Sequence, residues 1–181
     1  MNKSITQDVQ NDNQIFKTIR RFFIRFHVSF VLKSANAYKR IGFSAVEIFQ
    51  YLFLLIFSNR SMHMNFLTGR NTPAFAKDTV YRFMKVAQIN WIRFTTILSG
   101  RIIKEAIVPL DSLERANVLI IDDSMFDRNR SKKMELLTKV YDHAKHTYKF
   151  GFQILTLVWS YGSTFLPVNS VLLSSEIRGT E

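Results

Sequence analysis

The chain of 181 residues contains no cysteine, three prolines and six scattered glycines. Without cysteine it can form neither a disulfide framework nor a thiolate zinc site. The scattered glycines make no glycine-rich loop of the kind that binds phosphates. The whole sequence is 47% hydrophobic and 14% aromatic, which favours a chain folded around a hydrophobic core over a disordered one.

Long hydrophobic runs are also missing. The most apolar segment, Tyr51 to Phe57, is bracketed by polar residues and falls below the roughly 18 apolar residues that a membrane span needs. The polar start, Met1 to Gln14, contains Asp8 and Asp12, which fits neither a signal peptide nor a transit peptide. We therefore expect no membrane partner and a cytoplasmic location.

Acidic residues are scarce in the first two thirds of the chain. Residues 1–118 hold 17 Lys/Arg against 7 Asp/Glu (+10), and residues 119–181 hold 8 against 7 (+1), which together give the net charge of +11. The basic part should attract a polyanion, and with the aromatic content this favours nucleic acid. The alternative is a basic protein with no polyanionic partner.

The basic part has the periodicity of helices. We expect a disordered end over residues 1–14 and an amphipathic helix with a basic flank over residues 14–38. Ser44 should cap a second helix that ends near Ser58, with Glu47 completing a capping box. Residues 59–73 are interpreted as a connection.

Two further helices are expected, over residues 76–88 and 90–107, the latter ended by Pro109. The helix before the connection and the helix after it are compatible with a helix-turn-helix DNA-binding pair. The pattern is weakly specific, because many helical bundles contain such a pair and the connection is longer than a tight turn.

The segment after residue 117 changes character. Val118 to Ile121 form an apolar, β-branched run that predicts a strand buried on both faces, and the run meets Asp122 and Asp123 directly. Burying a carboxylate costs several kcal/mol unless a cation or hydrogen bonds compensate. The pair is therefore either a helix N-cap or a metal-binding acid. No clear helical period follows it, so the metal-binding interpretation is favoured.

Two more strands should follow. Residues 140–148 are interpreted as irregular, or as a loop over the site, and residues 150–159 and 164–173 as antiparallel strands joined by a turn at Tyr161-Gly162-Ser163. With the strand that contains the acids, they would form a three-stranded meander.

These segments together resemble a known family. The run Ile-Ile-Asp-Asp-Ser-Met-Phe-Asp-Arg (residues 120–128), the segment Tyr141 to Lys145 and the Gly-Phe…Phe-Leu-Pro-Val hairpin resemble the DDE transposases of the group named for insertion sequence 4. Gly69 to Pro73 and Thr79 to Phe83 are similar to that family's N-terminal helical region. The resemblance covers about residues 15–175, and it is the order of the motifs that makes it specific.

The resemblance implies an α+β chain. A helical, basic, DNA-binding region over residues 15–110 would precede a partial catalytic domain over residues 111–181. That domain would contain the first three antiparallel strands of a ribonuclease-H-like mixed sheet. In the family, three acids hold two divalent ions, Mg²⁺ or Mn²⁺, for attack on a phosphodiester.

The family's first acid is followed by a small hydroxyl residue, which matches Asp123-Ser124. Asp123 is therefore the expected catalytic acid and metal ligand. Asp122 is the less favoured alternative, because neighbouring side chains on a strand face opposite ways.

The family also needs a second Asp on a fourth strand and a later Glu, which we do not find. Glu176 and Glu181 lie too close to the hairpin to replace them. We therefore expect a truncated, catalytically incomplete transposase that retains DNA binding and does not hold the metal pair alone. The alternative is a non-enzymatic DNA-binding regulator of the parent element.

The expected partners are double-stranded DNA at the element's ends and, in one arrangement, a second copy of the chain, with no small-molecule cofactor. The residues expected to contact DNA are basic, hydroxyl or aromatic. They are Arg20, Arg21, Arg25, Arg70, Lys77, Thr79, Tyr81, Arg82, Lys85, Arg128, Arg130, Lys132, Lys133 and Lys145.

Overall fold

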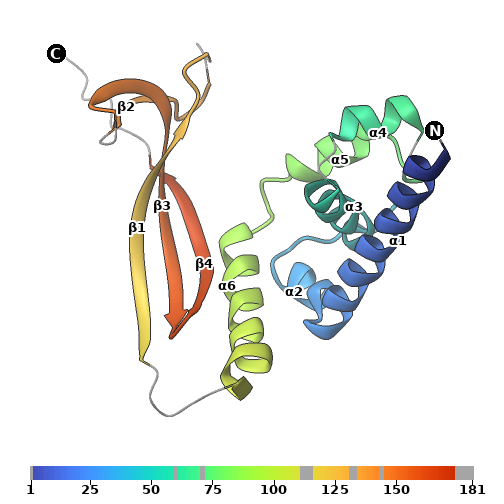
Figure 1. The fold of residues 1–181 in the computed structure, drawn as a ribbon, viewed down its shortest axis with the longest axis horizontal. Helices are drawn as coiled ribbons and strands as arrows, with labels where there is room; N and C mark the ends of the chain where they lie inside the picture. Colours follow the sequence, from blue (N-terminus) through green and yellow to red (C-terminus); the bar gives the residue numbers. More distant parts are fainter. Residues whose placement is uncertain are drawn as a thin grey trace. The chain divides into compact units, whose positions relative to one another are not determined.

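The computed structural model describes residues 2–58, 61–69, 72–110, 116–130, 134–142 and 145–173. The chain divides into two compact units, Met1–Leu98 and Ser99–Glu181. Among the described residues the first unit is helical, and the second contains an antiparallel sheet (Figure 1). The fold is therefore α+β, as expected. The unit boundary falls inside a helix, earlier than the boundary we expected near residue 110.

The helical unit begins with α1 (Asn2–Arg25) and α2 (Val28–Ser34). The sequence predicted one helix to residue 38 and a disordered end before residue 15. The structure instead breaks the helix at His27, whose φ of 49° is left-handed, and begins α1 at Asn2. Extending an existing helix costs little compared with nucleating one, which explains the early start.

The next helix, α3 (Ala45–Phe57), has the predicted N-terminus. Its cap, Ser44, accepts a hydrogen bond from the Glu47 backbone N–H at 3.2 Å, and the Ser44 backbone N–H donates to Glu47 Oε2 at 2.8 Å. These bonds confirm the capping box. They also lower the pKa of Glu47, because the hydroxyl and the backbone N–H of Ser44 both donate to the ionised carboxylate.

Three helices follow α3. They are α4 (Met62–Thr68), α5 (Lys77–Met84) and α6 (Trp91–Ile102), and α6 continues into a π-turn over Ile103–Ile107 and a 3₁₀ turn over Val108–Leu110. The sequence analysis missed α4, because Ser61 supplies its cap in a segment we interpreted as a connection. α4 therefore lies between α3 and α5, the two helices of the expected pair, which do not follow one another directly.

Aromatic side chains fill the centre of the helical unit. The Phe49 ring, on α3, lies 5.1 Å from that of Phe94, 5.9 Å from Trp91 and 6.0 Å from Phe23, measured between centroids. These contacts join α1, α3 and α6. Apolar burial of this kind is the main source of stability for short helices.

The sheet unit contains four strands among its described residues: β1 (Asn117–Asp127), β2 (Thr138–Asp142), β3 (Thr147–Tyr161) and β4 (Thr164–Leu173). β3 is central. β1 pairs with one of its edges over residues 151–161, and β2 and β4 pair with the other, all antiparallel. Figure 1 shows β1, β3 and β4 running side by side.

Two expectations about the sheet are wrong. Among the described residues of the range 140–148, residues 140–142 belong to β2 and residues 147–148 to β3, and the two strands pair antiparallel instead of forming an irregular loop. β1 is not buried on both faces. It runs through the acids to Asp127, and the side chains of Leu119 and Ile121 are 67% and 69% exposed. Periodicity cannot distinguish a doubly buried strand from an exposed apolar one, because both lack alternation.

The β3–β4 hairpin is as predicted, with its turn at Gly162. In the same unit, the hydroxyl of Ser99, at the C-terminal part of α6, donates to the Val168 carbonyl on β4 at 3.4 Å. Across the described residues, no helix is both long and apolar enough to cross a membrane.

Candidate catalytic site and nucleic-acid interface

Asp123 lies in the middle of β1, directly opposite Leu155 of β3. Its carboxylate Oδ2 accepts a hydrogen bond from Gln153 Nε2 at 2.6 Å. Gln153 faces Met125, so it reaches Asp123 along the diagonal of the strand pair. No cationic group contacts Asp123 within the described part of the chain. The carboxylate is therefore oriented by a neutral amide and keeps its charge uncompensated.

Asp123 shares a hollow with a second carboxylate. The hollow, of about 580 Å³, lies over β1, β2 and β3, and Asp123, Lys139, Asp142 and Gln153 are among its lining residues. The pairing register places Asp123, Gln153 and Asp142 on one face of the sheet. The hollow thus brings together two acids from different strands, β1 and β2, which both pair with β3 and not with each other.

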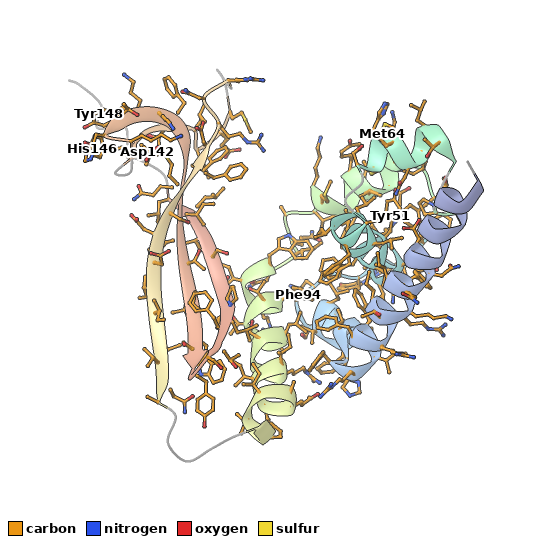
Figure 2. All side chains as sticks on the ribbon, in the orientation of Figure 1. Tyr51, Met64, Phe94, Asp142, His146 and Tyr148 are labelled. Atoms are coloured by element: carbon orange, nitrogen blue, oxygen red, sulfur yellow. The ribbon has the colours of Figure 1, made fainter. Side chains whose placement is uncertain are left out.

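Asp142 is held differently from Asp123. Lys149 Nζ lies 3.0 Å from Asp142 Oδ2 and 3.5 Å from Asp127 Oδ2, and Lys145 N–H donates to Asp142 Oδ1 at 3.1 Å. The hydrogen bond to Asp142 is the main reason that the pKa of Lys149 is raised. Figure 2 shows Asp142 beside His146 and Tyr148 at the β2–β3 hairpin. Asp142 therefore stabilises the hairpin.

Asp122 points to the opposite face of the sheet, because it neighbours Asp123 along the strand. It is exposed and does not line the hollow. The geometry thus separates the two acids, with Asp123 alone facing Gln153 and Asp142. Which of them binds metal stays a prediction.

Gly151 lets β1 approach β3 closely next to this site. A Cβ atom at Gly151 would lie 2.5 Å from the Phe126 carbonyl oxygen and 3.3 Å from its carbonyl carbon. Real Cβ atoms do not approach backbone that closely. The glycine is therefore required for the pairing that places Asp123 over the hollow.

The described residues fit one ligand of a divalent ion and not a whole site. A carboxylate is a preferred ligand of Mg²⁺, and Asp123 has no competing cation. However, no group of three or more acidic, histidine or cysteine side chains that could hold a metal occurs in the described part of the chain. Glu176 and Glu181 lie outside the described residues.

The residues expected to contact DNA fall into two sets in the helical unit. Arg20, Arg21 and Arg25 are exposed on α1, and none of them forms an ion pair within the described residues. The second set lies on or just after α5, which Val80 and Phe83 anchor in the core.

Two hollows flank α5. Lys77 and Tyr81 line one of about 480 Å³ together with His63 of α4. Thr79 and Arg82 line the other, of about 390 Å³, and Lys85 is exposed at the end of the helix.

The second hollow contains residues that the sequence analysis missed. Its other wall is the loop between α2 and α3, including Tyr38, Lys39 and Ile41. The sequence signal for this wall is the adjacent basic pair Lys39-Arg40, and neither residue is among those expected to contact DNA. Gln153 was missed as well, because nothing in a strand sequence marks a diagonal contact.

The remaining expected DNA contacts lie in the sheet unit or outside the described residues. The Arg128 guanidinium carbon lies 4.8 Å from the Phe126 ring centroid, and Arg130 and Lys145 are exposed. Arg70, Lys132 and Lys133 lie outside the described residues.

Comparison with known proteins gives the chain a family. A family model described as DDE superfamily endonuclease matches residues 50–177, which is most of the chain. The chain belongs to this family. In this DDE-family chain the match includes β1 with Asp123, the hollow and the four strands that the structure describes. The comparisons with curated proteins and with solved structures each found no match.

Proposed function

We propose that this DDE-family chain is a transposase of the group named for insertion sequence 4, with a ribonuclease-H-like catalytic domain. In this proposal the helical unit binds duplex DNA and Asp123 is the first metal-binding acid. Two divalent ions, when bound, stabilise the attacking and leaving oxygens of a phosphodiester in this chemistry.

One observation carries the proposal. The two carboxylates of the hollow differ, since Lys149 neutralises Asp142 at 3.0 Å whereas Asp123 meets only the neutral Gln153 amide. A metal-binding acid must keep its charge and a defined orientation, and an amide hydrogen bond gives both. The proposal is also supported by the family match, because the matched residues include β1.

The chain is proposed to be catalytically incomplete on its own. One carboxylate cannot hold two Mg²⁺ ions in register, because each ion requires near-octahedral oxygen coordination. The second Asp and the Glu would therefore come from outside the described residues.

Metal binding tests the role of Asp123. We expect Mn²⁺ binding by the full chain, measured by electron paramagnetic resonance, to be weakened by Asp123→Asn and unchanged by Asp122→Asn. The matched control neighbours Asp123 and faces the other side of the sheet. Mn²⁺ binding that depends on Asp122, or on neither residue, would contradict the assignment.

Measurements of DNA binding and of strand cleavage test the other two parts of the proposal, the DNA-binding role of the helical unit and the catalytic incompleteness of the chain. Because each neutralised phosphate contributes about −0.9 to the slope of log affinity against log salt, duplex affinity should fall steeply with salt. We expect no strand cleavage by the chain alone with Mg²⁺ or Mn²⁺. Cleavage that Asp123→Ala abolishes would show that the chain supplies all its metal ligands. The absence of duplex binding at low salt would refute the DNA-binding part.

A second candidate is a non-enzymatic DNA-binding regulator. The observation that favours it is the concentration of exposed cations on α1 and α5 in the helical unit. DNA binding that is unaffected by Mn²⁺ and by Asp123→Asn, together with no measurable Mn²⁺ binding, would select this alternative.

A further inference from the structure

The loop between α2 and α3, residues 38–43, exposes an apolar tip flanked by cations. Ile41 is 87% exposed, the most exposed of the large hydrophobic side chains in the described part of the chain, and Tyr38 is 54% exposed. Lys39 and Arg40 lie between them, exposed and without an ion pair among the described residues. An isolated exposed Leu or Ile needs no explanation, but one at the tip of a basic loop does.

Both ends of this loop are fixed, so its tip projects from a rigid base. On one side Ala37 is buried and its N–H donates to the Leu32 carbonyl at 2.8 Å. On the other side the Phe43 ring meets Phe75 edge-on at 5.3 Å, and the capping box follows immediately. Anchoring at both ends lowers the entropy cost of binding through the tip.

Gly42 makes the projection feasible. Its φ is +78°, a conformation that other residues adopt at a cost, and nothing lies within 4 Å of the position where its Cβ would be. Gly42 therefore permits the left-handed backbone conformation directly after Ile41, whose side chain is 87% exposed.

The 38–43 loop lies beside α5. Tyr38, Lys39 and Ile41 line the same hollow as Thr79 and Arg82 of α5. A basic helix and a basic loop with an apolar tip thus stand on opposite sides of one groove. Their shared charge indicates a polyanion as the partner of both.

We propose that the 38–43 loop enters the minor groove of duplex DNA, with Ile41 as an apolar wedge between base pairs and Lys39 and Arg40 on the flanking phosphates. This rests on the proposed DNA binding and extends it to a surface outside the residues expected from the sequence. Proteins that bind the minor groove insert Ile, Leu or Phe side chains in this way, with basic residues beside them, and kink the duplex.

The proposal separates the effects of two kinds of substitution in the full chain. Ile41 neutralises no phosphate, so Ile41→Ala should weaken duplex binding by about tenfold or more while leaving the salt slope unchanged. Lys39→Ala and Arg40→Ala should each make the salt slope shallower by about one phosphate contact. Ile56→Ala is the matched control, because Ile56 is 71% exposed on α3 and lies outside this groove.

The measurement is fluorescence anisotropy of a labelled 20-base-pair duplex over a range of salt concentrations. A second duplex carries 2-aminopurine, whose fluorescence rises when its base step unstacks. We expect that rise with the native chain and its loss with Ile41→Ala. Circular dichroism of each variant shows whether the fold is retained.

Each of the other possible results would overturn a defined part of the proposals. If Ile41→Ala binds and unstacks DNA like the native chain, while Arg21→Ala weakens binding, the loop is not the wedge and the proposed DNA binding stands. If the native chain binds no duplex at low salt, both proposals fail. Ile41-dependent binding to vesicles of anionic phospholipid, without duplex binding, would assign the loop to a membrane surface instead.

Discussion

Replacing Gly151 by alanine should destabilise the sheet unit, because there is no room for the added methyl group. The Cβ would lie 2.5 Å from the Phe126 carbonyl oxygen, which belongs to the backbone of the paired strand β1. Relief requires the β1–β3 ladder to open locally. Overpacking of this kind costs about 1–3 kcal/mol.

The matched control is Gly100→Ala. Gly100 lies inside α6, and apart from its chain neighbours and the backbone of its own helix no described atom lies within 4 Å of its Cβ position. Alanine is a better helix former than glycine, so this variant should gain about 0.4–1 kcal/mol. The same chemical change should therefore have opposite signs at the two positions.

Thermal unfolding followed by circular dichroism compares the two variants. In a unit of this size a change of 1 kcal/mol shifts Tm by about 4–8 °C. Gly151→Ala should thus lower Tm by at least about 4 °C, whereas Gly100→Ala should raise it slightly. If Gly151→Ala is as stable as the native chain, β1 does not approach β3 as described, and the placement of Asp123 beside Gln153 loses its basis.

Three further changes should affect stability. Ser44→Ala should cost about 1 kcal/mol in urea unfolding at pH 7. Because the cap lowers the pKa of Glu47, that cost should shrink as pH falls below the ordinary glutamate value of about 4.3. Lys149→Met should destabilise the sheet unit at pH 8 by removing the partner of Asp142. Since the pKa of Lys149 is raised, its contribution is full below about pH 10.4 and is lost above the raised value, so native and variant unfolding should converge there. Ile48→Ala, at a fully buried position, should cost about 2–5 kcal/mol, against less than about 0.5 kcal/mol for the exposed Ile56→Ala.

Local signals predicted the parts of the fold that depend on local chemistry. The capping box at Ser44 and Glu47 and the turn at Gly162 were predicted because their hydrogen bonds or dihedral angles require particular residues within a few positions. The α+β fold class was predicted from the family resemblance together with the helical and strand-like periods of the sequence. Alternation between helical and strand-like periods survives even where the boundaries of elements shift.

Features that depend on neighbours distant in sequence were missed. The break at His27 has no glycine or proline to announce it, and its left-handed conformation is tolerated because α2 resumes at once. The hairpin of β2 contains His146 with a φ of 51°, which also lacks a turn signal. Partners 30 residues apart, such as Asp123 and Gln153, can be identified only once the strand register is known.

Asp123 remains the expected metal ligand, although one sequence argument for a metal-binding acid, the cost of burial, does not survive. That argument took the cost of burying two acids as the reason for a metal, and β1 is in fact exposed around both of them. The case for Asp123 as a metal ligand now rests on the difference between the two carboxylates that line the same hollow. Lys149 satisfies Asp142, whereas the Gln153 amide orients Asp123 without neutralising it. A divalent ion entering the hollow would therefore displace no cation from Asp123, but would have to compete with Lys149 for Asp142.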